Sequence, residues 1–428
     1  MSSQKLFITP EMRYNSYMEE ARKKELIESF LTRGVENYIP NKAEIEKMLN
    51  SGRVLNVYMG IDPTATKIHL GHAFPLRKLQ ILAELGHHVT FLIGDFTATV
   101  GDTSDKETER PMLSREQIEE NFKDYRRQAK KFLDFSKIEV HFNSEWLSKL
   151  DFAAVLKLTK HFSLNDFISR ELIKKRLLEG KSVSLPEVLY PIMQGYDSMA
   201  LDTDIQIGGT DQTFNMQAGR TLIKDLKGKD SCIITNGFLP GTDGRKMSKT
   251  WGNAIWLEDS PEEVFGKVMS VKDDMIVTYY VMGTNAPQNV IDEAKKRLES
   301  GENPMNIKRE LARVIVKELC GKEEVDAAEE FFQKTVVEKK VDENALEITT
   351  NVDELGIVQP IIKDGTSLLD FIVDSGLAQS KSEAKRLLEE GALYLDEKRI
   401  VKGDEVIKLH IGINVIRVGK RKYLKIIK

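Results

Sequence analysis

Two histidines three residues apart, His69 and His72, lie where a strand-like run at 54–58 gives way to an amphipathic helix pattern that continues to about residue 85. A helix N-terminus offers free backbone N–H groups and a partial positive charge, so it suits a phosphate group. Gly71, between the histidines, leaves room for a flat ring to approach the backbone. Taken alone, the segment also fits the capping and packing residues of an ordinary strand–helix unit.

The loop around the histidines makes the pattern more specific. Residues 58–72 read Tyr-Met-Gly-Ile-Asp-Pro-Thr-Ala-Thr-Lys-Ile-His-Leu-Gly-His. This order resembles the first signature of class I aminoacyl-tRNA synthetases, whose usual wording is His-Ile-Gly-His. Their second signature, Lys-Met-Ser-Lys-Ser, has a counterpart at 246–250, Lys-Met-Ser-Lys-Thr. Two motifs in the right order are more specific than one, and they imply activation of a carboxylate by ATP.

Length and composition limit the class of protein. At 428 residues the chain exceeds the usual size of one core, so we expect two or three domains. Hydrophobic residues make up 41% and charged residues 30%, which is typical of a globular protein. No apolar run approaches the length of a membrane span, and residues 1–10 lack a signal-peptide pattern, so a cytoplasmic protein is expected.

Charge and cysteine content limit which nucleic-acid partners and metal sites can be expected. The net charge of −4 argues against general nucleic-acid binding, but residues 410–428 hold six Lys or Arg and no acid, so an RNA partner is expected there. Cys232 and Cys320 lie far apart, with no metal-binding Cys/His pattern, so no metal site is predicted.

The hydrophobic pattern predicts an α/β chain with a Rossmann-like, doubly wound parallel sheet, followed by a helical domain and a small α+β domain. The sheet is predicted from strands at 54–58, 88–93 and 137–142 that alternate with helices at 72–85 and 114–133. Ligands of such sheets bind at the carboxyl ends of the strands, at a topological switch point. The predicted divisions are 1–52 helical, 53–259 catalytic, 260–340 helical, 341–364 linker and 365–428 RNA-binding.

The last segment resembles a small RNA-binding module shared by a small-subunit ribosomal protein and several RNA-modifying enzymes. The stretch 376–388, Gly-Leu-Ala-Gln-Ser-Lys-Ser-Glu-Ala-Lys-Arg-Leu-Leu, carries the resemblance, with a capping box at Ser380 and Glu383 and Gly391 closing the helix. Strand-like runs follow at 392–395, 406–409 and 415–418. A charged surface helix is the alternative. The expected RNA contacts are Lys381, Lys385, Arg386, Arg417, Lys420, Arg421 and Lys422.

The choice of amino acid depends on a helix face with Tyr190, Gln194 and Asp197, spaced by four and three residues. A phenol, an amide and a carboxylate are unusual for a core, but they suit a zwitterion that bears a hydroxyl. A polar face at a subunit interface is the alternative. With Tyr58 and the stretches 101–106 and 206–212, this face resembles the tyrosyl-tRNA synthetase family, and the likeness extends from about residue 25 to 428.

That resemblance implies a role for each matching residue. A carboxylate acceptor beside a tyrosine donor satisfies a phenol in both directions, whereas phenylalanine would leave both groups unpaired. The implied amino-acid contacts are Tyr58 and Asp197 to the phenol, Asp102, Tyr190 and Gln194 to the ammonium group, and Gln212 near the carboxylate.

The reaction implied is attack of the tyrosine carboxylate on the α-phosphorus of ATP, followed by transfer of tyrosine to the terminal adenosine of tRNA. The substrate supplies the nucleophile, so positioning and charge stabilisation carry the catalysis. ATP is expected to arrive with Mg²⁺. The implied ATP contacts are Thr64 and His69 at the γ-phosphate, His72, Gly71 and Asp62 around the nucleotide, Asp211 and Gly209 at the ribose, Lys246 and Lys249 on a mobile Gly-rich loop, and Lys106 and Arg110 opposite them.

The sequence departs from the family at Leu70 for isoleucine, at Thr250 for serine, and at 103–105, Thr-Ser-Asp for Pro-Ser-Gly, which leaves the geometry around Lys106 open. A tryptophanyl-tRNA synthetase is the nearest rival, but it lacks the basic tail and needs an acceptor for an indole N–H. A non-catalytic RNA-binding protein on the same scaffold would be expected to have lost signature residues. The expected partners are tRNA, tyrosine, ATP and a second copy that packs through the catalytic domains.

Overall fold

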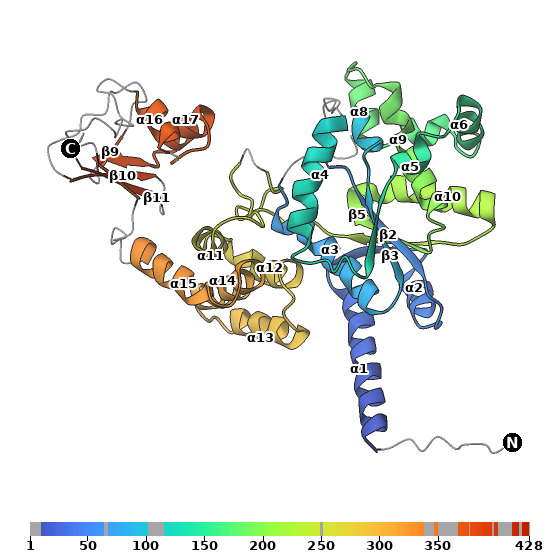
Figure 1. The fold of residues 1–428 in the computed structure, drawn as a ribbon, viewed down its shortest axis with the longest axis horizontal. Helices are drawn as coiled ribbons and strands as arrows, with labels where there is room; N and C mark the ends of the chain where they lie inside the picture. The colour runs from blue at the N-terminus through green and yellow to red at the C-terminus, as the bar shows by residue number, and fades with distance from the viewer. Residues whose placement is uncertain are drawn as a thin grey trace. The chain divides into compact units, whose positions relative to one another are not determined.

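The computed structural model describes residues 10–63, 67–101, 115–248, 251–337, 346–349, 367–375, 377–395, 398–400, 413–418 and 422–427. Its contacts divide the chain into two compact units (Figure 1). The first comprises Met1–Asp259 with Ser270–Leu311, and the second comprises Ser260–Met269 with Ala312–Lys428. None of the helices in these ranges combines the length and the apolar character that crossing a membrane demands.

A six-stranded sheet forms the centre of the first unit, in the order β1-β6-β5-β2-β3-β4. Every neighbouring pair is parallel except β1 with β6, so the predicted parallel sheet is confirmed. The edge strand β1 was not predicted, because it is short and lies in a segment, 1–52, that was predicted to be helical. The strands are β1 (Val35–Ile39), β2 (Asn56–Ile61), β3 (His88–Ile93), β4 (Ile138–Phe142), β5 (Ile205–Gly209) and β6 (Cys232–Asn236).

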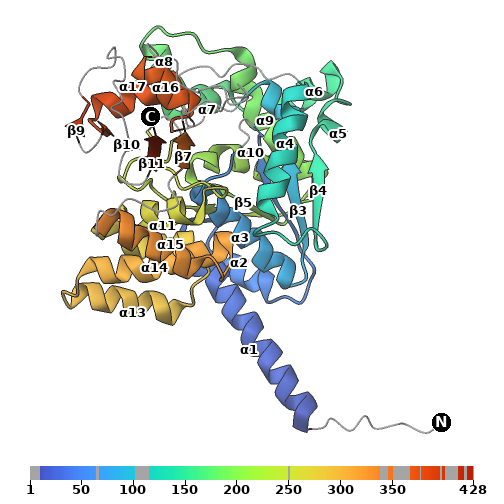
Figure 2. The same cartoon turned by 60° about the vertical axis from the view of Figure 1, so that its left-hand side comes forward.

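The helices of the first unit agree with the predicted pattern in type but differ at their ends. Helix α4 ends four residues before the predicted boundary. Helix α1 lies within the segment 1–52 that was predicted to be helical, and it projects away from the sheet (Figure 2). The helices are α1 (Pro10–Thr32), α2 (Lys42–Leu49), α3 (Leu70–Glu84), α4 (Arg115–Ala129), α5 (Ser144–Leu147), α6 (Phe152–Thr159), α7 (Leu164–Ile168), α8 (Glu171–Leu178), α9 (Leu185–Ala200), α10 (Thr213–Lys227), α12 (Ile276–Gly283) and α13 (Gln288–Glu299).

Helix α9 has a fixed start. Ser184 caps it through a capping box with Glu187, and the carboxylate of Glu187 also pairs with Arg176 at 2.7 Å. Both charged side chains are buried. Removing one partner of a buried pair leaves an uncompensated charge, so the pair specifies how α8 and α9 meet.

Helices α9 and α10 cross closely because glycine lies on each side of the contact. A Cβ added to Gly195 would lie 3.1 Å from the carbonyl carbon of Ala218, and one added to Gly219 would lie 2.4 Å from Oγ of Ser198. Neither position has room for a side chain. The crossing therefore sets how far α9 stands from the carboxyl end of β5.

The topology places a crevice between β2 and β5. From β2 the chain continues through β3 to β4 at one edge, and it then returns to β5 on the other side of β2. This change of direction is the topological switch point at which such sheets bind ligands. The loop before α3 and the loop after β5 both leave the sheet there.

The second unit contains helices and a small second sheet. Helices α11 (Pro261–Met269) and α15 (Val325–Phe332) pack through the rings of Phe265 and Phe332, whose centroids are 5.5 Å apart. Helix α14 (Pro304–Cys320) runs across the boundary between the units. The sheet has the order β7-β11-β10-β8-β9.

The C-terminal module confirms the predicted pair of helices and the sheet. Ser380 accepts from the backbone N–H of Glu383, as predicted, but the Glu383 carboxylate accepts from Gln379 rather than completing the box. The predicted strand at 406–409 lies outside the described residues. The elements are α16 (Leu368–Asp374), α17 (Lys381–Glu389), β7 (Leu346–Thr349), β8 (Leu393–Leu395), β9 (Lys398–Arg399), β10 (Ile413–Val418) and β11 (Lys422–Ile427).

Candidate active site

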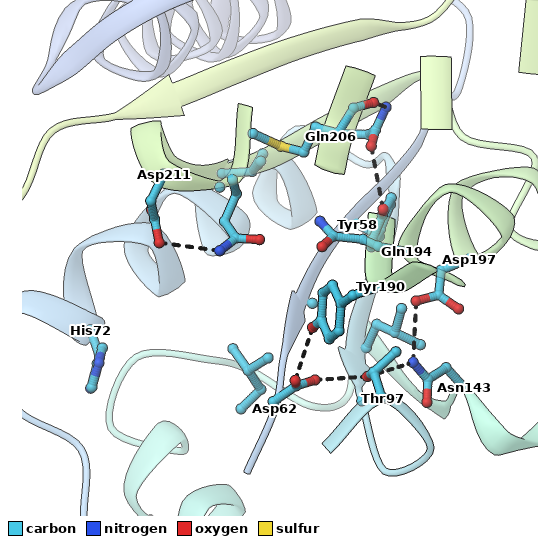
Figure 3. Close-up of a pocket in the computed structure, with 18 of the residues that line it drawn as sticks. Tyr58, Asp62, His72, Thr97, Asn143, Tyr190, Gln194, Asp197, Gln206 and Asp211 are labelled. Carbon is cyan, nitrogen blue, oxygen red and sulfur yellow. Dashed lines mark hydrogen bonds between the residues drawn. The ribbon is translucent and has the colours of Figure 1, made fainter. Parts of the chain in front are cut away.

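Two pockets adjoin at the carboxyl ends of β2 and β5, with volumes of about 260 and 250 Å³. They share a wall, so molecules bound in the two pockets would meet there. The wall comprises Gly60, Ile61, His72, Tyr125, Gly208, Asp211 and Gln212. Figure 3 shows the first pocket, with side chains from both sides of the switch point.

One face of α9 lines the first pocket with Tyr190, Gln194 and Asp197, as their spacing predicts (Figure 3). The phenol of Tyr190 donates to Oδ2 of Asp62 at 2.9 Å, and Thr97 donates to the other carboxylate oxygen at 2.7 Å. Asp62, expected among the ATP contacts, thus lines the first pocket beside Tyr190. Its carboxylate gives this end of the pocket a negative charge.

Asp197 lies at the other end of the same pocket and is buried. Its Oδ1 accepts from Nε1 of Trp146 at 2.7 Å, and its Oδ2 accepts from Nδ2 of Asn143 at 3.2 Å. The same Asn143 amide donates to Oγ1 of Thr97 at 3.0 Å. Because Thr97 in turn donates to Asp62, one hydrogen-bond network joins the two ends of the pocket (Figure 3).

Asn143, Trp146 and Thr97 are site residues that the sequence analysis missed. Thr97 follows β3, and the other two follow β4, so all three come from the carboxyl end of a parallel strand. That position was the available signal, because loops at this edge carry the ligand contacts of such sheets. A polar residue after a strand is too common to be singled out without its partners.

Burial makes Asp197 a weak acid. Removal from water raises the pKa of its carboxyl to about 8, against the hydrogen bonds from Trp146 and Asn143, which lower it, and nearby Asp62 and Asp95 raise it further. Tyr58, which lines the same pocket, has its pKa raised above its ordinary value, mainly by burial. The end of the pocket at Tyr58 and Asp197 is therefore largely uncharged near pH 7.

The second pocket contains the two signature histidines with their rings stacked, the centroids 3.6 Å apart. Burial lowers the pKa of His69 to about 2 and that of His72 to about 4, and the ammonium group of Lys246 lowers both further. Both rings are thus neutral at pH 7, and each has one N–H to donate. They can hydrogen-bond phosphate oxygens while Lys246 supplies the positive charge.

The start of α3 is held by a second chain segment. The backbone N–H of Leu70 donates to the carbonyl of Ile255 at 2.8 Å, and that of Leu257 donates to Ile68 at 3.0 Å. The ring of Trp256 lies against His69, with centroids 5.7 Å apart. This short antiparallel bridge fixes where the histidines stand.

A buried asparagine, Asn253, holds the first part of the second signature. Its Nδ2 donates to Oδ1 of Asp243 at 2.8 Å and to the carbonyl of Lys246 at 3.1 Å, while its Oδ1 accepts from the N–H of Ser248 at 2.9 Å. A Cβ at Gly241 would lie 2.3 Å from that Nδ2, so glycine is required there. Lys246 is therefore presented by a fixed stem.

The remaining predicted ATP contacts divide between described and undescribed parts of the chain. Gly71, Gly209 and Lys246 line the second pocket, while Asp211 and Gln212 line both. Phe238, not predicted, is 52% exposed at this pocket, with Nζ of Lys246 5.6 Å from its ring. The predicted site residues outside the described ranges are Thr64, Asp102, Lys106, Arg110 and Lys249. Within those ranges, no group of three or more His, Cys, Asp or Glu side chains could hold a metal ion.

The predicted RNA contacts lie in the C-terminal module. Lys385 is exposed on α17, where Lys381 pairs with Asp370. The guanidinium of Arg417 lies 3.8 Å from the centre of the Tyr394 ring. Of the remaining predicted contacts, Arg386 lies on α17, Lys422 begins β11, and Lys420 and Arg421 fall outside the described residues.

Comparison with known proteins gives matches over both units. Residues 50–337 match the family model described as tRNA synthetases class I (W and Y), and residues 347–426 match that of the Tyrosine--tRNA ligase SYY-like C-terminal domain. The Tyrosine--tRNA ligase of Carboxydothermus hydrogenoformans is 41% identical over 403 residues, which cover 93% of this chain and 96% of that protein. That of Thermotoga maritima is 38% identical, covering 92% and 96%.

Solved structures share the fold at lower identity. A C-terminally truncated mitochondrial tyrosyl-tRNA synthetase from Aspergillus nidulans matches with a TM-score of 0.61 and 23% identity, covering 74% of this chain and 95% of that one. The tryptophanyl-tRNA synthetase of Plasmodium falciparum matches with a TM-score of 0.55 and 16% identity, covering 73% and 93%. At these identities the likeness concerns the fold alone.

Asp197→Asn is expected to change how folding stability depends on pH. The Asp197 carboxyl has an ordinary pKa of 3.8 when unfolded and about 8 when folded, so between these values the folded chain binds one more proton. This group's contribution to stability therefore falls as pH rises, by at most about 1.4 kcal/mol per pH unit. In denaturant titrations between pH 5 and 8, the free energy of unfolding of the variant should increase relative to that of the wild type as pH rises. Asp292→Asn, at an exposed carboxyl on α13, is the control. Parallel curves for the wild type and Asp197→Asn would contradict the assignment.

Proposed function

This chain belongs to the tyrosine–tRNA ligases within the class I tRNA synthetases, and we propose that its two adjoining pockets hold tyrosine and ATP for that reaction. The enzyme activates tyrosine with ATP to tyrosyl-adenylate and transfers the tyrosyl group to the 3′ terminal adenosine of its tRNA. The observation that carries the assignment of the pockets is their shared wall, since it brings a carboxylate from one side to a phosphate from the other.

In our proposal tyrosine lies along the first pocket with its phenol at Tyr58 and Asp197. Its ammonium group faces Tyr190 and Gln194, where the carboxylate of Asp62 supplies the complementary charge. Asp102 is proposed to join this end. The substrate carboxylate then points to Gln212 on the shared wall, which is the direction in which it must attack ATP.

ATP occupies the second pocket in this proposal, with Mg²⁺ as part of the substrate. His69 and His72 donate neutral hydrogen bonds to phosphate oxygens, and Lys246 with Lys249 neutralises the charge that develops on the departing pyrophosphate. Gly71 leaves space for the nucleotide, since a Cβ there would lie 3.2 Å from the His69 ring. The other proposed contacts are Thr64, Lys106 and Arg110 at the phosphates and Gly209 with Asp211 at the ribose.

The two rival functions receive less support. A tryptophan pocket needs one acceptor for an indole N–H, whereas this pocket ends in a carboxyl and a phenol, and the relatives at about 40% identity are tyrosine–tRNA ligases. A scaffold without catalysis has no need to keep His69, His72 and Lys246 together around one pocket.

Pyrophosphate exchange tests the catalytic proposal directly. With each of the twenty amino acids in turn, only tyrosine should support exchange of labelled pyrophosphate into ATP. Lys246→Ala and Lys249→Ala should each lower the turnover about 10²-fold or more, because they remove charge that acts in the transition state, while tyrosine affinity in equilibrium dialysis stays nearly unchanged. Lys295→Ala, an exposed lysine on α13, is the control. Exchange with tryptophan would refute the assignment of tyrosine to the first pocket. Unchanged turnover in both lysine variants would refute the proposed role of Lys246 and Lys249.

Two segments in the C-terminal part of the chain supply the proposed tRNA contacts. We propose that the helical segment 260–340 reaches the anticodon region and that the C-terminal module 365–428 binds the tRNA backbone through its basic side chains. Arg417 on Tyr394 offers a flat cationic surface of the kind that stacks with bases. Because the tRNA substrate serves protein synthesis, we propose a cytoplasmic location.

Charging assays should separate the module from the catalytic site. Deleting residues 365–428 is expected to leave tyrosyl-adenylate formation intact and to lower the efficiency of tRNA charging about tenfold or more. Lys385→Glu should lower charging more at low salt than at high salt, because each lost phosphate contact reduces the salt dependence of binding. Lys295→Glu serves as the matched charge change. Full charging efficiency of the truncated chain at low protein concentration would show that the module acts elsewhere.

An exposed apolar surface supports the proposed homodimer. Six large apolar side chains along the segment from α6 to the start of α9 are 48% to 79% exposed, and a second chain that covered them would remove this apolar area from water. They are Phe152, Leu156, Leu164, Leu177, Leu178 and Leu185. All belong to the first unit, in agreement with pairing through the catalytic domains.

Charge placed on this surface should break the dimer. Phe152→Asp and Leu178→Asp are each expected to give a monomer in sedimentation equilibrium, because the dimer would bury the new carboxylate. Leu226→Asp, at a leucine 47% exposed on α10, is the matched control and should sediment like the wild type. A wild-type chain that is already monomeric would exclude the proposed dimer.

A further inference from the structure

The hydroxyl of Tyr58 belongs to a buried hydrogen-bond relay behind the phenol-binding end of the first pocket. Its oxygen lies 2.7 Å from Oγ of Ser198, and that Oγ lies 2.8 Å from Oε1 of Gln206. The Tyr58 hydroxyl is also 3.3 Å from the same Oε1. All three side chains are 3% exposed or less. Ser198 and Gln206 have no role in the function proposed so far.

The orientation of the Gln206 amide is fixed by its other partner. Nε2 of Gln206 donates to the backbone carbonyl of Met216 at 3.0 Å. A carbonyl can only accept, so the nitrogen must face Met216 and the oxygen must face the two hydroxyls. The relay therefore ends in an acceptor that cannot donate in return.

Two hydroxyl hydrogens must serve the short contacts of this relay. If Tyr58 donates to Ser198 and Ser198 donates to Gln206, the contacts of 2.7 and 2.8 Å each contain a hydrogen. If Tyr58 instead turns its hydrogen into the pocket, one of the two contacts becomes a pair of facing lone pairs. A buried polar contact without a hydrogen is costly, so the first arrangement is favoured.

We propose that Ser198 and Gln206 are positioning residues that hold the hydroxyl hydrogen of Tyr58 away from the pocket, so that Tyr58 meets the substrate phenol as an acceptor. The substrate then donates its phenol hydrogen to Tyr58. This inference rests on the proposed placement of tyrosine in the first pocket. It reverses the expectation from sequence that Tyr58 donates and Asp197 accepts.

The reversal assigns a protonated state to Asp197. If the phenol hydrogen goes to Tyr58, the phenol oxygen needs a donor, and the Asp197 carboxyl can supply one only in its acid form. Burial raises its pKa to about 8, and the neighbouring carboxylates Asp62 and Asp95, from the loops after β2 and β3, favour the acid form. The longer hydrogen bond to Oδ2, from Asn143, leaves that oxygen the better place for the proton.

The packing around the relay leaves it no freedom to rearrange. A Cβ on Gly219 would lie 2.4 Å from Oγ of Ser198 and 3.0 Å from Oε1 of Gln206. Because α10 approaches α9 so closely here, neither side chain can swing aside without moving a helix. The oxygen atoms of the relay are therefore in place before the substrate enters.

The pH dependence of amino-acid discrimination tests the proposal. Pyrophosphate exchange gives kcat/KM for tyrosine and for phenylalanine, which share every charged group and differ only in the phenol, so their ratio isolates that end of the pocket. The ratio should fall above about pH 8, by up to tenfold per pH unit, as Asp197 loses its proton. A ratio that stays constant or rises there would overturn the proposal, since it would mean that the carboxylate accepts the phenol hydrogen.

Variants of the relay distinguish a positioning role from a merely structural one, because only a positioning role should change how the ratio depends on pH. In Ser198→Ala/Gln206→Leu, Tyr58 has lost both internal acceptors and can donate to the substrate, so the ratio should no longer fall above pH 8. Ser231→Ala removes another buried hydroxyl, one without a hydrogen bond in the described part of the chain, and should keep the wild-type trend. An unchanged trend in the double variant would refute the roles of Ser198 and Gln206.

The wild-type curve decides the matter even if the double variant fails to fold, and Ser198→Ala alone is then the smaller change to compare. Different results would refute the proposed function and the proposed direction of hydrogen donation. A wild-type chain without tyrosine-dependent exchange would refute the proposed function. Exchange with a rising ratio would refute only the direction of donation.

Discussion

Buried polar groups must find hydrogen-bond partners, and this requirement organises the structure around the first pocket. Four side chains from four segments, Asp62, Thr97, Asn143 and Asp197, satisfy one another in a single network. Each one follows a strand or lies on α9. Displacing any of them would leave a buried donor or acceptor unpaired, so the network keeps the ends of the strands in register with the helix.

In the second pocket the positive charge comes from a lysine and not from the histidines. Burial keeps both histidines neutral, so Lys246 supplies positive charge to this pocket. A neutral N–H group still fixes the direction of a hydrogen bond, but it attracts anions less strongly than a charged group does. The fixed stem formed by Asn253 places Lys246 within this pocket.

Sequence patterns predicted the parallel sheet and the helix face of Tyr190, Gln194 and Asp197, because periodicity records both directly. They could not show the partners of those residues. Asn143 and Trp146 are distant from Asp197 in sequence, and they join it only when β4 and α9 pack. The hydrogen bond from Tyr190 to Asp62 was not predicted, since a sequence motif does not say which way a side chain points after a turn. The edge strand β1 was missed because it is short and pairs antiparallel with β6, which is distant in sequence.

The glycine at position 219 has a consequence for how sequences of this kind can diverge. It permits the close crossing of α9 and α10, and it also borders the hydroxyl of Ser198. A larger residue at 219 is tolerated only if residue 198 shrinks or the helices separate, and either change alters the surroundings of Tyr58. Helix packing and the surroundings of Tyr58 thus depend on one pair of positions, so substitutions at 198 and 219 should occur together rather than independently.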